Sequence, residues 1–413
     1  MRFLHTADLH LGQVMYQNYS REDEHQHFFS QLERWCGEYK PDALLVSGDI
    51  FDIQQPGAAT KHAFNEYFVH LHNLYPEMRI VITAGNHDSA SRIQADNVVW
   101  GMGNVTLVGR APASDCTQQP DGWQEEYVVR LAGKGYIIAL PYMVGSRKET
   151  LQALLNYVER ENREGLPVVM MGHTAVAGTD FTGHDLDIGH IQTLDPSELG
   201  DGYDYLALGH IHRPQTLGYQ QYEQEEVSLY PAGVMRYSGS ALHVSCDEKY
   251  PHSVSLVEIG RHGGEVTVTR LRIDELRHFY ELPADHSAQS YEEAVEAVET
   301  FAREGKRGYI RLKITYDTDL PSDFNQQIYD LIEGYGEEIR YNPKILWTDM
   351  PTEKKAVEKP VFEVADLQQM VNPMRFIEQT IDHYKGLSLE ELRSAFEEIE
   401  TEQKRIQEER SGK

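Results

Sequence analysis

Five short groups of acidic, amide and imidazole side chains lie within residues 8–212. They are Asp8-Leu9-His10, Gly48-Asp49, Gly85-Asn86-His87-Asp88, Gly172-His173 and Gly209-His210-Ile211-His212. Seven of these side chains are candidate metal ligands: Asp8, His10, Asp49, Asn86, His173, His210 and His212. Carboxylate, amide and imidazole groups without a thiolate suit Mn, Fe or Zn. Seven ligands exceed what one ion uses, so the set predicts two divalent ions that share a bridging carboxylate.

Each group alone is weak evidence. Asp-x-His occurs by chance in many proteins, and with 19 histidines in the chain any single one has a prior of only about one in ten of being a ligand. Other histidines are interpreted as ordinary, for example His25 and His27 on a polar helix face. The occurrence of all five groups in order, each after a strand-like run, is what favours one shared site.

Short aliphatic strands should position these groups. The predicted strands are Arg2–Thr6, Ala43–Val46, Arg79–Thr83, Val168–Met171 and Tyr205–Leu208, and the early ones alternate with predicted helices at Glu22–Tyr39 and Thr60–Leu74. In an open α/β sheet, ligands bind outside the carboxyl ends of the strands, so the groups should converge on one crevice. Residues 124–140 and 227–275 are instead typical of antiparallel hairpins. The fold class is therefore α/β (α+β), with a mixed sheet or two stacked sheets.

The chain is predicted to have three parts: 1–275, which carries the five groups; 276–350, a small α+β module; and 351–413, a linker followed by helices. The module is predicted to contain strand Phe279–Leu282, helix Tyr291–Glu304, strand Tyr309–Tyr316, helix Asp323–Tyr335 and strand Ile345–Thr348. The last predicted helix carries an apolar stripe of Leu389, Leu392, Phe396 and Ile399. The stripe alone favours packing on the chain itself, and docking on a partner is the alternative.

Charge and cysteine content bound the function. The net charge of −28 argues against binding to nucleic acid, although a local basic groove, bound cations or a basic partner would change that. The three cysteines lack CxxC spacing, which predicts a reducing compartment. The sequence has no apolar run long enough to span a membrane, and its N-terminus has no apolar signal segment. Together these features predict the cytoplasm.

The ordered groups resemble the signature of the calcineurin-like metallophosphoesterase superfamily. Five longer segments are similar to the SbcD family, the nuclease subunits of bacterial SbcCD complexes. They are His5-Thr-Ala-Asp-Leu-His-Leu-Gly12, Gly48-Asp-Ile-Phe-Asp52, Ala84-Gly-Asn-His-Asp88, Ala207-Leu-Gly-His-Ile-His212 and Tyr237-Ser-Gly-Ser240. The resemblance covers about residues 1–250. It implies a two-sheet β-sandwich flanked by helices, a small α+β capping domain, and C-terminal helices that bind the coiled coil of an SbcC-like ATPase.

The resemblance also implies roles for single residues. One metal would be held by Asp8, His10, Asp49 and His212, and the second by Asp49, Asn86, His173 and His210, so that Asp49 is the bridge. His87 would be the catalytic histidine that contacts the scissile phosphate and assists the leaving group. Two bridged cations lower the pKa of a bound water and leave a hydroxide in line with phosphorus.

Two acidic residues differ from this pattern or leave alternatives open. Some nuclease relatives carry a second histidine where this chain has Asp52, so that role is not transferred. Asp52 either orients a ligand histidine or faces solvent as a capping residue, and Asp88 has the same two interpretations.

The leading hypothesis is a Mn-dependent DNA exonuclease/endonuclease, with Mg, Fe or Zn as alternative metals. It would work with an SbcC-like ATPase in DNA repair, recombination and replication, as a homodimer within a heterotetramer and away from membranes. The alternative is a small-molecule metallophosphoesterase such as a cyclic-nucleotide phosphodiesterase, which the −28 charge suits better. A scaffold with a dead metal site is a third hypothesis, against which the intact ligand set argues.

Overall fold

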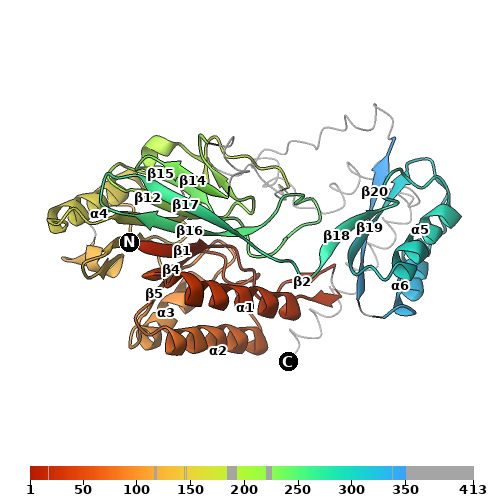
Figure 1. Ribbon diagram of the computed structural model, residues 1–413, viewed down its shortest axis with the longest axis horizontal. Helices are drawn as coiled ribbons and strands as arrows, with labels where there is room; N and C mark the ends of the chain where they lie inside the picture. The colour runs from red at the N-terminus through yellow and green to blue at the C-terminus, as the bar shows by residue number, and fades with distance from the viewer. Residues whose placement is uncertain are drawn as a thin grey trace, which may run out of the picture. The chain divides into compact units, whose positions relative to one another are not determined.

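Two β-sheets lie face to face, with helices on their outer sides (Figure 1). The computed structural model describes residues 1–349 except 17, 116–118, 144, 146, 184–192, 220–225 and 337. The predicted linker and helices at 351–413, with their apolar stripe, lie outside the described residues. Met1–Thr348 packs as one compact unit. No helix in the described part of the chain is long and apolar enough to span a membrane.

The first sheet has seven strands in the order β14-β17-β16-β1-β4-β5-β6. Their bounds are Val227–Tyr230, Val266–Arg272, Ser253–Ile259, Arg2–Thr6, Ala43–Ser47, Arg79–Thr83 and Val105–Val108. Strands β1, β4, β5 and β6 are parallel, and the other three are joined by antiparallel pairing. The parallel strands are buried on both faces, which explains why they are continuous apolar runs.

The second sheet has six strands in the order β13-β15-β12-β9-β8-β7. Their bounds are Gln215–Thr216, Val234–Tyr237, Tyr205–Gly209, Val168–His173, Gly135–Ala139 and Val128–Leu131. Strands β15, β12, β9 and β8 are parallel, and β7 and β13 pair antiparallel at the two edges. Two short ribbons join Val14–Met15 (β2) to Tyr19–Ser20 (β3), and Ala175–Val176 (β10) to Thr193–Leu194 (β11).

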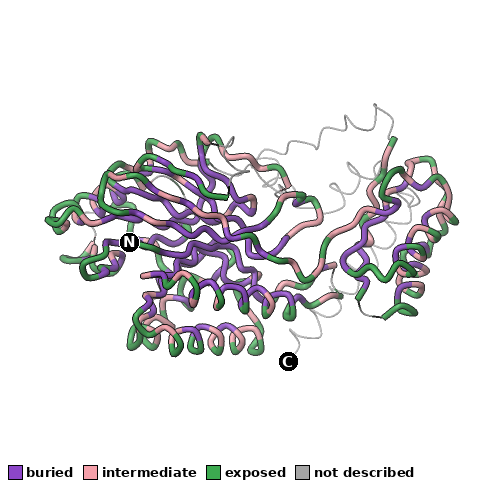
Figure 2. The backbone as a smooth tube through the Cα atoms, in the orientation of Figure 1, coloured by how far each residue is buried: buried purple, intermediate pink, exposed green. Residues whose placement is uncertain are grey.

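Helices cover both outer faces of this sandwich. They are α1 (Glu22–Tyr39), α2 (Ala58–Leu74), α3 (Ala90–Trp100) and α4 (Lys148–Glu161), with two short 3₁₀ turns at Trp123–Glu126 and Pro196–Glu198. Helix α1 buries Phe28, Leu32 and Trp35 on one stripe, in a core shared with Leu4 and Leu44 of the first sheet. A second core fills the space between the sheets and continues under α4, so the strands are the most deeply buried part of the chain (Figure 2).

Residues after 275 form a third sheet with its own core. Strands β18 (His278–Leu282), β19 (Gly308–Thr315) and β20 (Ile339–Thr348) are parallel, and α5 (Tyr291–Arg303) and α6 (Phe324–Glu333) connect them. A separate apolar cluster that includes Ile310 and Ile328 holds this α+β module together. Its elements run from His278 to Thr348, within the same compact unit as the sandwich, and the domain boundary at 275/276 stays a prediction.

One predicted strand of the module is too short. The strand predicted at Ile345–Thr348 begins six residues earlier, at Ile339. The sequence places Pro343 inside this segment, and proline normally ends or interrupts a strand because it lacks a backbone N–H. The pairing register between β19 and β20 shifts between Arg311 and Lys313, opposite this proline. The strand therefore continues through the proline at the cost of a local irregularity.

Candidate metal centre

The seven candidate ligands meet at one end of the sandwich, where strands of both sheets stop. The seven-stranded sheet contributes Asp8, His10, Asp49 and Asn86, after β1, β4 and β5, and the six-stranded sheet contributes His173, His210 and His212, at or after β9 and β12. The two sheets are held in line here by a hydrogen bond from the Ser47 hydroxyl to the carbonyl oxygen of Ala207. The convergence predicted from the strand ends is therefore present in the structure.

Four of these residues have a left-handed backbone. The φ angles are 51° at Asp8, 45° at His10, 47° at Asp49 and 91° at His210. Residues other than glycine adopt such angles at a cost of about 1–3 kcal/mol each, and do so where the surroundings over-determine the conformation. The sharp turns aim short side chains back across the ends of the strands.

Glycines beside the ligands leave room for them. A Cβ atom at Gly48 would lie 2.1 Å from Nδ1 of His173, and one at Gly85 would lie 2.0 Å from Oδ1 of Asp49. A Cβ at Gly209 would lie 1.9 Å from the Ser47 carbonyl oxygen. Glycine is therefore needed at positions 48, 85 and 209, because side-chain or backbone atoms of neighbouring segments would lie within about 2 Å of any Cβ there.

The first group of ligands consists of Asp8, His10 and His212. One ligand atom from each lies within 4.8 Å of the others, and all three residues are buried. Neither ring nitrogen of His10 has a hydrogen-bond partner among the described residues, although the side chain is only 3% exposed. Buried polar atoms are normally satisfied, so these two nitrogens indicate a place for a ligand such as a cation.

The second group consists of Asp49, His173 and His210, again with one ligand atom from each within 4.8 Å. The amide oxygen Oδ1 of Asn86 lies 3.0 Å from Nε2 of His173 and 3.0 Å from Nδ1 of His210, at the centre of this group. Oδ2 of Asp49 lies 3.3 Å from Nε2 of His173 and 3.9 Å from Nε2 of His10. Asp49 therefore lies between the two groups and borders both.

The surroundings shift the pKa values of the two buried carboxylates, Asp8 and Asp49, in opposite directions. Burial raises the pKa of Asp8, although the imidazoles of His173 and His212 act against this shift. Burial acts in the same direction on Asp49, but the facing imidazoles of His173 and His10 outweigh it and hold the pKa of Asp49 well below its usual range. Burial alone would lower the pKa of His173, yet Asp49 and Asp8 raise it to about 9. A proton on His173 supplies positive charge that a divalent cation would supply, so cations and protons compete here.

His87 lies beside the first group, and with His10 and Asp52 it forms a third cluster whose ligand atoms lie within 4.8 Å of one another. Its backbone N–H donates to Oδ1 of Asp49 at 2.8 Å, and its Nδ1–H donates to the carbonyl oxygen of Asp52 at 2.7 Å. Its ring lies 5.0 Å from that of His10, centroid to centroid, and is exposed. The ring is thus fixed through Nδ1, which leaves Nε2 as the nitrogen that can face a bound phosphate.

The structure distinguishes between the two interpretations of Asp52 and Asp88. Oδ1 of Asp52 lies 3.3 Å from Nδ1 of His10, so this carboxylate faces a candidate ligand. The Asp88 carboxylate instead accepts backbone N–H groups from Ile50, Phe51 and Gly85 at 2.8–3.0 Å. Asp88 therefore braces the loops after β4 and β5 against each other. Burial, followed by the nearby Asp49 charge, raises the pKa of Asp88 to about 6.

Two supporting residues were missed at the level of the sequence. The Glu248 carboxylate accepts a hydrogen bond from Nδ1 of His212 at 2.9 Å and from the backbone N–H of Val244 at 3.1 Å. This bond directs the other ring nitrogen of His212 toward Asp8.

The prediction that His25 lies on a polar helix face is wrong. His25 is 5% exposed, and its Nε2–H donates to the carbonyl oxygen of Leu9, in the loop between Asp8 and His10.

The chain belongs to the calcineurin-like phosphoesterase family, whose pattern matches residues 1–214. Within that family it is 31% identical to the SbcD subunit of the nuclease SbcCD from Escherichia coli K12 over 275 residues, which are 62% of this chain and 65% of that one. The corresponding protein of Rhodobacter capsulatus is 30% identical (63% and 66% covered), and that of Bacillus subtilis is 26% identical (65% and 68% covered). The match thus spans just under two thirds of the E. coli relative.

Family membership confirms the predicted fold class, and it implies two divalent metals. The candidate ligands suit such ions, because carboxylate, amide and imidazole groups lie close together. Both ring nitrogens of His10 also lack a hydrogen-bond partner among the described residues. Two ions that share a carboxylate need their ligands in two adjacent groups, and this is the arrangement around Asp49.

The Glu248–His212 hydrogen bond generates the first prediction. Glu248→Gln should weaken Mn²⁺ binding by about 10–100-fold, the usual effect of removing a partner that orients a ligand histidine. Isothermal titration calorimetry of the full chain measures it. Glu275→Gln is the matched control, since Glu275 lies 3.5 Å from His243, which is not a candidate ligand. Equal Mn²⁺ affinity in the Glu248 variant and the wild type would contradict a role for Glu248 in holding His212.

Proposed function

We propose that this protein is a dimetal phosphodiester hydrolase that cleaves DNA. The observation that carries the proposal is the position of Asp49 between two groups of buried ligands, one with His10 and one with His173. A single carboxylate between two imidazole clusters fits a pair of cations and has little use in a protein that holds one ion or none. The intact donor set also argues against a scaffold with a dead site.

Each ion would be held by four side chains. Asp8, His10, Asp49 and His212 would bind one ion, and Asp49, Asn86, His173 and His210 the other. When bound, the ions would activate water and neutralise charge on the phosphate oxygens. The protein's part is to keep the ligands in place. The Ser47 carbonyl oxygen accepts from Nδ1–H of His173 at 2.8 Å, and Glu248 does the same for His212.

His87 would act on the leaving group. Its Nδ1–H donates to the Asp52 carbonyl and its backbone N–H to Asp49, so the ring is fixed next to the ligands. In this proposal His87 binds no metal itself. A protonated Nε2 could donate to the departing oxygen as a general acid. Because the ring is exposed, it can take a new proton from solvent after each cycle.

DNA as substrate and Mn as the metal are the finer parts of the proposal. DNA is supported by the relatives, which are named as nuclease subunits, and by the additional α+β module, which a small phosphodiesterase rarely needs. From the same relatives we infer an SbcC-like ATPase partner bound through 351–413, a homodimer within the assembly, a cytoplasmic location, and a role in repair and recombination. The −28 net charge favours the alternative, a small phosphodiester substrate.

Asp49→Asn tests the bridging carboxylate. The variant should lose Mn²⁺-dependent hydrolysis of bis-p-nitrophenyl phosphate and of linear duplex DNA, because it weakens the one group that borders both ligand clusters. Circular dichroism should show an unchanged fold. Asp121→Asn, at an exposed position away from the ligands, is the control and should keep wild-type rates. Substantial turnover by folded Asp49→Asn would contradict the dimetal proposal.

His87→Ala tests the division of roles. The variant should bind as much Mn²⁺ as the wild type but hydrolyse the same substrates about 10²–10⁴-fold more slowly, the usual contribution of a positioned acid or base. Elemental analysis gives the metal content and a rate assay the activity. His70→Ala, on the exposed side of α2, serves as the control. Loss of one ion from the His87 variant would show that His87 is a ligand.

A further inference from the structure

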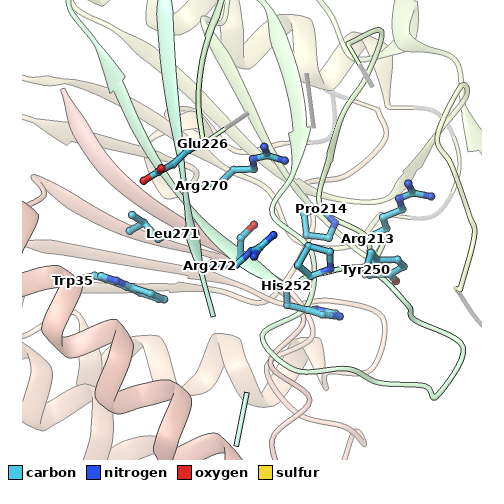
Figure 3. A pocket seen from close by; sticks show the side chains of 11 residues that line it. Trp35, Arg213, Pro214, Glu226, Tyr250, His252, Arg270, Leu271 and Arg272 are labelled. Atoms are coloured by element: carbon cyan, nitrogen blue, oxygen red, sulfur yellow. The ribbon is translucent and has the colours of Figure 1, made fainter. Parts of the chain in front are cut away.

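A pocket of about 950 Å³ opens beside the metal centre, on the other side of Glu248. It is formed by the C-terminal end of β17, by the segment that leads into β16, and by the residues that follow His212 (Figure 3). His252 lines this pocket, and its Nε2 lies 3.3 Å from Oε2 of Glu248. The other oxygen of Glu248 holds His212, so one carboxylate separates the pocket from a candidate metal ligand.

The pocket is cationic in a strongly acidic chain. Arg213, Arg270 and Arg272 line it, against one carboxylate, that of Glu226. The Arg213 guanidinium also pairs with Asp180. Arg272 is exposed and forms no ion pair with any residue that the structure describes. Figure 3 shows Arg272 between Trp35 on one side and Pro214 and Tyr250 on the other. Three arginines here, in a chain with 38 basic and 66 acidic residues, are a local reversal of the overall charge.

An aromatic surface accompanies the charges. The Arg213 guanidinium lies over the ring of Tyr250, 5.6 Å from its centroid, and Trp35 lines the opposite wall. Arginines for the phosphate backbone, together with aromatic faces for bases, are the combination by which proteins bind single-stranded nucleic acid. An isolated phosphate would need only the charges.

We propose that this pocket binds single-stranded nucleic acid, holding a backbone phosphate at Arg272 and a base against Tyr250. The inference rests on the proposed function, in which DNA is the substrate, and adds a second binding region away from the metal ligands. A strand held here and at the metal centre would be anchored on both sides of Glu248. The pocket also supplies the local basic groove that the net charge alone argues against.

The test measures binding of a fluorescein-labelled 20-nucleotide oligothymidine to the full chain by fluorescence anisotropy, in EDTA and over a series of salt concentrations. Arg272→Gln and Arg272→Glu should weaken binding severalfold. They should reduce the slope of log K against log salt by about 0.7, because one phosphate fewer is neutralised. Arg307→Glu is the matched control, an exposed arginine of the α+β module, and should change neither quantity much. Circular dichroism checks the fold of each variant.

Three results would overturn the proposal: unchanged binding by both Arg272 variants, an equal loss in the Arg307 control, or an equal loss on a blunt 20-base-pair duplex, whose stacked bases cannot reach Tyr250. Because binding is measured in EDTA, the result does not depend on catalysis. A chain that binds the oligonucleotide through Arg272 but hydrolyses no phosphodiester would refute the proposed function and leave the pocket assignment intact.

Discussion

Two carboxylates of the seven-stranded sheet, Asp8 and Asp49, are buried against His173 of the six-stranded sheet, and most other features of the site follow from this contact. Moving charges out of water costs several kcal/mol per ion unless opposite charge and hydrogen bonds offset it. Nε2 of His173 lies 3.3 Å from Asp49, and its Nδ1 lies 3.9 Å from Asp8. The contact joins the two sheets at the point where their strands end. It also accounts for glycine at 48 and 85, because a side chain there would displace the ring or the carboxylate.

The same constraint explains why the site is divided into ligands and supports. A cation that replaces the protons on these imidazoles meets donors already turned inward by strained backbone and by bonds outside the site. Asp88 ties together the loops that carry Asp49 and Asn86, and His25 supports the loop that carries Asp8 and His10. Preorganised ligands lose little entropy when metal binds. Packing in the rest of the sandwich offsets the free-energy cost of the strained backbone at these ligands, as is usual for functional sites.

The sequence predicted the parts of the site that lie at strand ends, and missed those that depend on tertiary contact. Strand Arg2–Thr6 and helix Glu22–Tyr39 agree with β1 and α1, since each has a clear apolar period. Glu248 follows no strand, and its role depends on a tertiary contact with His212, so its position in the sequence did not indicate that role. His25 looked solvent-facing because its helix neighbours are polar, whereas a single hydrogen bond to Leu9 decides its position. The pocket arginines come from separate segments, at 213 and at 270–272. Their clustering appears only in the folded chain, and the net charge of the whole chain does not indicate it.

In the proposed dimetal centre, Asp49 bridges two adjacent metal ions. Electron paramagnetic resonance of the chain loaded with two equivalents of Mn²⁺ tests it directly, because two Mn²⁺ ions about 3.5–4 Å apart are magnetically coupled, whereas distant ions are not. The wild type should give a coupled two-manganese spectrum, and Asp49→Asn should lose it. A spectrum of isolated Mn²⁺ ions in the fully loaded wild-type protein would contradict the bridging role of Asp49.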